Sequence, residues 1–257
     1  MDLDLHDDWV LANYKSPSQQ ARLITERWFA SQMYCPICLN LHINPAETNT
    51  KVIDFSCKTC AHEFQLKSKK NKISGKITDG AYRPMIERIE ANTAPDFFFM
   101  EYLSEDWVVK NLFLVPRFFM NKTIIEKRRP LSSTAKRSGW IGCNILISKL
   151  PEEGRIAIIK DETAIRKKDV QNKYRALAFL DSKNYAQRGW FADVLYYVRK
   201  LDAESFSLND VYQFVGELEK LHPENAHVRE KIRQQLQILR DRHILRFDGN
   251  GGYTLLK

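Results

Sequence analysis

The sequence predicts a mixed α/β protein made of two domains. Four runs within residues 96–161 are rich in aromatic and β-branched side chains, which is typical of buried strands. Residues 190–242 hold three segments with apolar residues at helical spacing, and two short strand-like runs around a glycine-rich turn follow them. Three helices followed by a hairpin is the pattern of a winged-helix domain. Because the pattern changes near residues 181–188, we assign residues 1–183 to the first domain and residues 184–257 to the second.

The elements of the first domain can be placed in chain order. Pro17 is typical of a helix start, and apolar residues at helical spacing predict a helix over residues 16–32. A cysteine-rich segment, residues 34–70, precedes a second predicted helix at 81–90. Four strands are then predicted, over residues 96–103, 107–115, 140–148 and 154–161. A basic stretch, residues 122–137, separates the second strand from the third. Residues 161–188 are polar and favour a helix.

The second domain begins with an amphipathic helix predicted over residues 190–200. Ser207 and Asp210 form a capping-box pattern that opens a second helix. A third helix is predicted over residues 226–242. Two short strands complete the domain on either side of the turn at residues 248–252, and they cover residues 244–247 and 253–256.

Composition places the chain among soluble globular proteins. Apolar residues make up 44% of its 257 residues, and it contains no run of about 18 apolar residues that would predict a membrane span. Its acidic start lacks the features of a secretory signal, so we expect a cytoplasmic protein, in which disulfides are rare. The net charge of +8 favours a polyanionic partner such as nucleic acid, although many basic proteins bind none.

Two CxxC pairs predict a structural zinc site. Cys35 and Cys38 form the first pair, Cys57 and Cys60 form the second, and 18 residues separate the pairs. This spacing is typical of two knuckles that together supply four thiolates to one tetrahedral Zn²⁺. Four sulfur ligands leave no open coordination position, so the predicted zinc is structural and not catalytic.

A group of polar residues surrounds the second CxxC pair and suggests phosphodiester chemistry. Asp54 ends an apolar run before the pair, and Gln65 and Lys67 follow it on one face of a predicted strand. The turn made by the second pair would bring the three side chains together. Asp54 and Gln65 offer oxygen ligands to Mg²⁺, and Lys67 can position a water or stabilise developing negative charge. Glu63 lies on the same strand face as a possible further carboxylate.

This pattern resembles the PD-(D/E)xK nuclease core, but a solvated strand face of mixed charge is the alternative for so short a motif. Longer segments carry a wider resemblance: VIDFSCKTCAHEFQLKSKK, DGAY, STAKRSGWIGCNI and EKIRQQLQILRD resemble the DpnI family of methyl-directed restriction enzymes. The resemblance extends from Tyr14 to the end. It implies a PD-(D/E)xK endonuclease domain with a four-cysteine zinc site, followed by a C-terminal winged-helix domain. The implied activity is blunt cleavage of double-stranded DNA within GATC sites that carry N6-methyladenine.

One departure from the family pattern concerns the catalytic motif. The family has glutamate where this chain has Gln65, so the site loses one negative charge, which should weaken Mg²⁺ binding. We still expect cleavage, because other PD-(D/E)xK nucleases use QxK and Glu63 is close by. The alternatives are a reader of adenine-methylated DNA that does not cleave, and a general nuclease without methyl specificity.

Both domains contain candidate DNA contacts. The third predicted helix of the second domain carries an apolar stripe and, next to it, a polar stripe that fits the major groove. The polar stripe consists of Arg229, Arg233, Gln237 and Arg240. In the first domain Lys69 and Lys70 follow the catalytic strand and fit phosphate contacts. Tyr82 and Arg137 belong to segments that match the family near the DNA. Trp140 is the candidate sensor of the methyl group, with a core tryptophan as the equal alternative. Two reading domains in one chain are consistent with a monomer.

Overall fold

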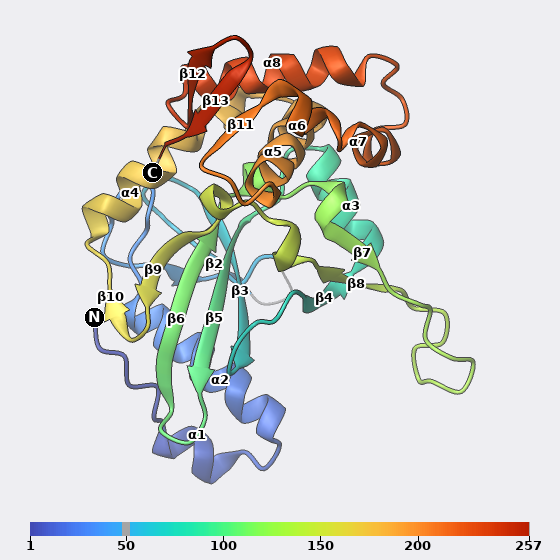
Figure 1. Cartoon of the computed structure of the whole chain (residues 1–257). Coiled ribbons are helices and arrows are strands. Elements are labelled where there is room, and N and C mark those ends of the chain that lie inside the picture. Colours follow the sequence, from blue (N-terminus) through green and yellow to red (C-terminus); the bar gives the residue numbers. More distant parts are fainter. Residues whose placement is uncertain (48–51, 257) are drawn as a thin grey trace.

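The computed structural model describes residues 1–47 and 52–256 (Figure 1). Within this part of the chain the central sheet has seven strands in the order β1-β2-β3-β5-β6-β9-β10. Neighbouring strands are antiparallel except β3 and β5, which are parallel. The strands are Asn44–Pro45 (β1), Phe55–Ser56 (β2), Glu63–Lys70 (β3), Asp96–Leu103 (β5), Val108–Val115 (β6), Ile156–Lys160 (β9) and Thr163–Ala164 (β10).

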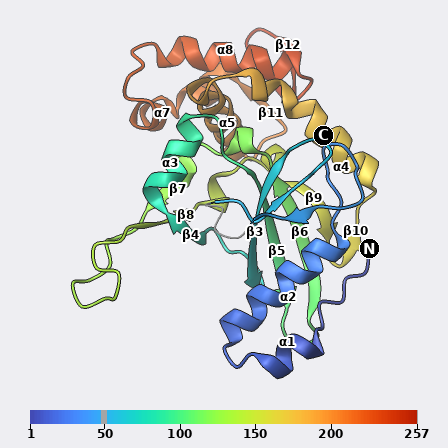
Figure 2. The ribbon, with the colours of Figure 1, turned by 180° about the vertical axis from the view of Figure 1, so that it is seen from behind.

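Two helices near the N-terminus, α1 (Asp8–Asn13) and α2 (Pro17–Gln32), lie on one face of this sheet (Figure 2). The ring of Phe29 packs 4.7 Å from that of Phe98, which ties α2 to β5. The helix predicted over residues 16–32 is confirmed, with Ser16 at its N-cap. The predicted strand 96–103 is also confirmed. The strand predicted from residue 107 begins one residue later, because Trp107 has a left-handed φ of 48°.

A second, smaller sheet has the strand order β4-β8-β7. Its strands are Ile77–Ala81 (β4), Ile125–Lys127 (β7) and Gly142–Ile145 (β8), and α3 (Tyr82–Glu90) follows β4 directly. The segment between β7 and β8 projects from the body of the molecule (Figure 1). The strand predicted over residues 140–148 is too long, since the chain turns into a 3-10 helix after Leu146. Arg155 holds this turn by donating to the carbonyl oxygens of Ile147 and Leu150 at 2.6 and 2.7 Å.

Short helices connect the two sheets to the C-terminal region. The 3-10 helices are Arg117–Phe119 (η1), Lys122–Ile124 (η2), Ile147–Lys149 (η3), Glu152–Gly154 (η4) and Ala178–Ser182 (η5). The polar segment 161–188 forms α4 (Lys167–Leu177) as its main element, in agreement with its predicted helical preference. α4 packs along the sheet through its buried face, which includes Val170 and Tyr174.

The C-terminal region contains the predicted helices and hairpin. Its elements are α5 (Tyr185–Lys200), β11 (Ser205–Ser207), α6 (Leu208–Tyr212), α7 (Val215–Leu221), α8 (Val228–Asp241), β12 (Leu245–Gly249) and β13 (Gly252–Leu255). The Ser207–Asp210 capping box is confirmed. The second predicted helix is divided at Phe214, whose ring turns inward to lie 4.8 Å from that of Tyr197. β11 was missed; it pairs with β13 and makes the hairpin a three-stranded sheet.

α5 joins this region to the rest of the protein. It begins at Tyr185, earlier than predicted, because Asn184 and Gln187 form a capping box. The helix is buried along most of its length and contacts η1, η2 and η4 on one side and α8 on the other. Arg199 of α5 also pairs with Glu153. Among the described residues, no helix combines the length and apolar character needed to span a membrane.

Candidate functional site

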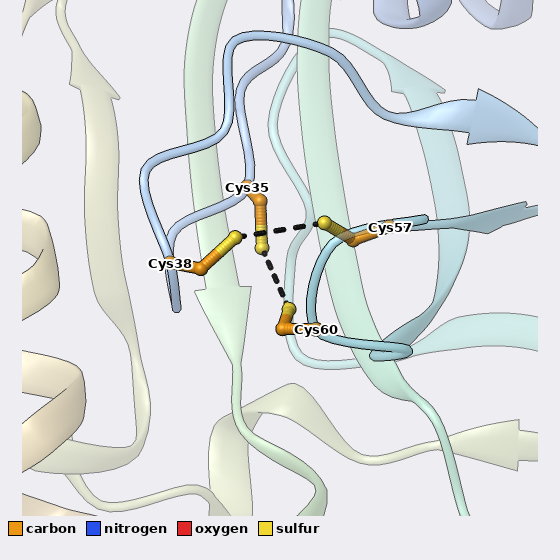
Figure 3. Close-up of side chains that lie close together, drawn as sticks. All are labelled: Cys35, Cys38, Cys57 and Cys60. Atoms are coloured by element: carbon orange, nitrogen blue, oxygen red, sulfur yellow. Dashed lines mark hydrogen bonds between the residues drawn. The ribbon is translucent and has the colours of Figure 1, made fainter.

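The four cysteines of the two CxxC pairs converge on one point (Figure 3). The Sγ atoms of Cys35 and Cys60 are 3.5 Å apart, those of Cys38 and Cys57 are 3.6 Å apart, and all four lie within 4.8 Å of one another. A Zn–S bond of about 2.3 Å places tetrahedral sulfur ligands about 3.8 Å apart, whereas a disulfide needs about 2.0 Å. The cluster could therefore hold a metal ion, and its cysteines are free thiols.

The two thiols of the second knuckle differ in acidity, because burial raises the pKa of Cys60 to about 11. Burial opposes ionisation of Cys57, but hydrogen bonds from the backbone N–H groups of Cys60 and Thr59, and then from the Cys38 and Cys60 thiols, lower its pKa to about 7. The first knuckle is tied to α4, because Gln171 Nε2 donates to the carbonyl oxygen of Ile37 at 2.8 Å. The cluster thus closes the turn that leads from β2 into β3 and holds it against the sheet.

This turn sets the register of the candidate catalytic strand. Phe55 pairs with Phe64, and the backbone N–H of Asp54 donates to the carbonyl oxygen of Phe64 at 2.9 Å. Asp54 Oδ2 in turn accepts a hydrogen bond from the backbone N–H of Leu66, also at 2.9 Å. The Asp54 carboxylate is therefore fixed beside the Gln65–Lys67 segment, as the predicted hairpin requires.

Gln65 and Lys67 face a cavity of about 240 Å³. Asp79 of β4 lines the same cavity, and Lys67 forms an ion pair with it. Both partners are largely shielded from solvent, with side-chain exposures of 17% for Lys67 and 3% for Asp79. Gln65 is 7% exposed, and its buried Oε1 atom has no hydrogen-bond partner among the described residues. An acceptor oxygen left unpaired in a cavity is suited to a cation.

The charges around this cavity influence one another. Burial raises the pKa of Asp54 above its ordinary value, while the Leu66 N–H and the Lys67 ammonium lower it and Asp79 raises it. Glu26 of α2 also has a raised pKa, first because of burial and further because of the Asp54 charge, although Arg22 opposes the shift. Glu26 and Asp54 both line a neighbouring cavity of about 400 Å³. Asp79 and Glu26 are thus two carboxyl groups near Asp54 beyond the predicted set, which was Asp54, Gln65 and Lys67 with Glu63 as a possible further carboxylate.

Sequence reasoning missed Asp79 and Glu26 as members of this cluster. Asp79 lies on a different sheet and Glu26 on a helix, so no local spacing connects either to Asp54. Period-two alternation in β4 could have indicated that Asp79 points inward, because Ile77 and Asp79 are buried while Thr78 and Gly80 are exposed.

Glu63, the possible additional carboxylate, lies elsewhere. It is opposite Ser56 in the hairpin, and its Oε2 is 3.5 Å from Nη1 of Arg88 on α3. Its side chain is 46% exposed. The structure therefore pairs Glu63 with Arg88 and does not place it at the cavity that Gln65 and Lys67 line.

Trp140 lies at the base of the projecting β7–β8 segment and is half-buried. It lines an open cavity of about 600 Å³ together with Tyr82, Lys127 and Gly139. The Arg137 guanidinium stacks 4.8 Å from the Trp140 ring centroid. This position differs from that of a core tryptophan, which was the alternative. Lys69 is half-buried and Lys70 exposed at the end of β3.

Gly142 is necessary for this position of the Trp140 ring. A Cβ atom at residue 142 would lie 2.8 Å from Cζ3 and Cη2 of the indole, which is closer than van der Waals contact allows. The ring therefore packs directly against the β8 backbone and also lines the cavity.

Three faces can be distinguished on α8. The predicted apolar stripe is buried and comprises Val228, Ile232, Gln235, Leu236 and Leu239. A second face, which includes Ile238 and Arg242, borders a groove against η5 and α5. The predicted stripe of Arg229, Arg233, Gln237 and Arg240 is exposed on a third face. Within this stripe Arg229 stacks on the Tyr212 ring, and Arg233 donates to the Tyr212 hydroxyl at 2.9 Å.

These features define a mixed α/β protein with a sheet core, a four-cysteine cluster that could hold a metal, and a C-terminal helix-turn-helix domain with a wing. Residues 1–183 match the model of the Dam-replacing family, and residues 186–255 match that of the Dam-replacing HTH domain. The protein belongs to the DpnI family. The resemblance seen in the sequence is confirmed, and membership suggests methyl-directed recognition or cleavage of DNA.

Proposed function

We propose that the protein is a Mg²⁺-dependent type II endonuclease that cleaves double-stranded DNA at GATC sites containing N6-methyladenine. The observation that carries this proposal is the position of Asp54, Gln65 and Lys67. The Asp54 carboxylate is hydrogen-bonded to the strand segment that presents Gln65 and Lys67 to one cavity. A protein that only reads DNA has no use for a carboxylate and a lysine arranged in this way.

The residues present fit a hard cation. Asp54 and the unpartnered Gln65 Oε1 are oxygen donors, which Mg²⁺ prefers. Bound Mg²⁺ would polarise the scissile phosphate and lower the pKa of the attacking water. The Lys67 ammonium would orient that water or stabilise negative charge on the phosphate oxygens. The side chains of Gln65, Lys67 and Asp79 are largely buried, and this strengthens their electrostatic interactions.

The remaining sites support the same function. The four-cysteine cluster would hold a structural Zn²⁺ that keeps β2 and β3 in register. Lys69, Lys70 and Arg137 would contact phosphates, while Trp140 and Tyr82 border the cavity that we assign to the methylated adenine. The exposed stripe of α8 would read the major groove in a second domain comprising residues 184–257. We propose a cytoplasmic monomer that makes a blunt cut by nicking the two strands in turn.

A second candidate function is reading of adenine-methylated DNA without cleavage. Gln65 favours it, because the family's glutamate would add a negative charge to the metal site. The ion pair between Lys67 and Asp79 also occupies the lysine in the free protein.

Digestion of matched plasmids distinguishes these functions. Adenine-methylated and unmethylated forms of one plasmid are incubated with the protein and Mg²⁺, and binding to methylated and unmethylated duplexes is measured by fluorescence anisotropy. We expect cleavage of the methylated form alone, and loss of cleavage but not of binding in Asp54→Ala. Glu63→Ala is the matched control, because Glu63 lies away from the cavity. Equal cleavage of both plasmids would refute methyl direction, and binding without cleavage would favour the reader.

A further inference from the structure

Asp79 lies across the cavity from the two residues of the catalytic motif. It belongs to β4 in the smaller sheet, whereas Gln65 and Lys67 belong to β3 in the central sheet. Its side chain is 3% exposed. Besides the Lys67 ammonium, its close polar neighbour is the Cys143 thiol, whose sulfur is 4.0 Å from Asp79 Oδ2. A carboxylate buried to this degree requires a compensating positive charge.

The Lys67 ammonium supplies that charge in the free protein, but Lys67 is also the residue that the hydrolytic reaction needs. The cavity also contains an acceptor without a donor, since Gln65 Oε1 is buried and unpartnered among the described residues. Gln65 and Asp79 thus line the same cavity with their oxygen-bearing side chains. The Asp54 carboxylate lies close enough to interact electrostatically with both Lys67 and Asp79. A divalent cation in this space would satisfy the Gln65 oxygen and compensate the Asp79 charge without Lys67.

We propose that Asp79 is the second carboxylate of the metal site and replaces the charge that Gln65 lacks. The proposal rests on the proposed endonuclease function and deepens it. Asp54 and Asp79 would provide two negative charges, and Gln65 would provide a neutral oxygen. In the free protein Lys67 holds the Asp79 carboxylate in place, and cation binding to that carboxylate frees the ammonium for the scissile phosphate.

Metal affinity in the absence of DNA tests this assignment directly. The zinc-loaded protein is titrated with Mn²⁺, and free Mn²⁺ is followed by electron paramagnetic resonance. Asp79→Asn is expected to weaken Mn²⁺ binding on the order of 10- to 100-fold. Lys67→Ala breaks the same ion pair from the other side and is the matched control. It should abolish cleavage while Mn²⁺ affinity stays the same or rises.

A pair of further variants tests the same assignment in the direction of tighter binding, and circular dichroism spectra equal to that of the natural protein verify that each variant is folded. Gln65→Glu should bind Mn²⁺ more tightly than the natural protein, because it provides a third carboxylate. Adding Asp79→Asn to Gln65→Glu should then lower the affinity back to about the natural level. Equal Mn²⁺ affinity in the single and double variants would overturn the proposal, because Asp79 would then serve only to position Lys67.

Failure of the proposed function would give a different result. If the natural protein bound no Mn²⁺ beyond the Asp54→Ala variant and cleaved no DNA, there would be no catalytic metal site for Asp79 to complete. If the natural protein bound Mn²⁺ in a way that depended on Asp54 but not on Asp79, only the role of Asp79 would be wrong.

Discussion

Asp54 Oδ2 accepts a hydrogen bond from the backbone N–H of Leu66, 12 positions further along the chain. Asp54 directly precedes β2, the first arm of the hairpin, and Leu66 lies near the middle of β3, the second arm. The bond therefore reaches β3 between Gln65 and Lys67, whose side chains line the candidate active site. The carboxylate is therefore oriented by the backbone, and the four-cysteine cluster at the turn determines which residue lies opposite it.

Replacing Asp54 with asparagine should abolish cleavage of methylated DNA. The variant keeps the shape and can still accept from the Leu66 N–H, but it loses the charge that holds the cation. We expect a decrease in the single-turnover cleavage rate of about 1000-fold, or ~4 kcal/mol of transition-state stabilisation. Duplex affinity without Mg²⁺ should be nearly unchanged. A variant that cleaves at more than about a tenth of the natural rate would show that the charge is not required.

Removing one cysteine of the cluster should release zinc and unfold the surrounding segment. Cys57→Ser is the informative change, because Cys57 lies in the turn that sets the register of β2 and β3. Zinc content measured by mass spectrometry should fall from about one ion per chain to about none, with a loss of thermal stability. Cys143→Ser is the control, because Cys143 is buried in β8 away from the cluster. Equal zinc content in both variants would contradict the assignment.

The stability of the protein should depend on pH through Asp96. This residue is fully buried at the start of β5, where it accepts from the Arg117 N–H at 2.7 Å and from the Tyr174 hydroxyl at 3.2 Å. Burial raises its pKa from 3.8 to about 7, against the opposing effect of Arg117. Between these two values the folded chain binds more protons than the unfolded chain. The free energy of unfolding therefore decreases as pH rises through this window.

Urea unfolding at about pH 5 and about pH 8 measures this contribution. The natural protein should lose on the order of a few kcal/mol more than Asp96→Asn does over the same interval. Asparagine keeps the acceptor for the Arg117 N–H but cannot ionise. If both proteins showed the same dependence on pH, the ionisation of Asp96 would not contribute.

Trp140 should determine how strongly methylated sites are preferred. Trp140→Ala is expected to lower the ratio of cleavage rates on methylated and unmethylated DNA about 10- to 200-fold, since a single apolar contact of this size carries that range of discrimination. Gly142→Ala should act in the same direction, because its Cβ would displace the indole ring. Gly139→Ala is not a neutral control, because Gly139 has a left-handed φ that would strain an alanine even though there is open space for its Cβ. Trp140→Phe, which keeps a ring, should retain part of the preference. An unchanged ratio in Trp140→Ala would exclude Trp140 as the sensor.

The exposed face of α8 should contribute to DNA affinity more than its other faces. Arg233→Ala is expected to cost about 1–3 kcal/mol of binding free energy. Lys231→Ala removes the same charge from the face that borders the η5–α5 groove and should have a smaller effect. Measurement of affinity at several salt concentrations separates the two roles of Arg233. A smaller salt slope indicates a phosphate contact, and relaxed sequence preference indicates a base contact. Equal losses in both variants would contradict the assignment of this face.

Much of the fold could be predicted because it follows from local patterns. The helices at residues 16–32 and 81–90 and the strand at 96–103 have clear periodicity or β-branched and aromatic composition, and they are confirmed within a residue or so. Errors occurred where distant residues decide the local structure. The long strand prediction at 140–148 failed because Arg155 stabilises a turn there, and β11 was missed because three residues acquire strand structure only by pairing with β13.

By itself the sequence determined the four-cysteine cluster, the position of Asp54 opposite the Gln65–Lys67 segment and the apolar and basic stripes of α8. Each of these follows from spacing along a short stretch of chain, where covalent geometry limits the possible distances. Only the tertiary structure decided that Glu63 pairs with Arg88, that Asp79 lines the catalytic cavity and that Glu26 lines the neighbouring cavity with Asp54. These contacts join residues of different elements, and they form because the packing of two sheets and a helix brings together side chains that no local pattern relates.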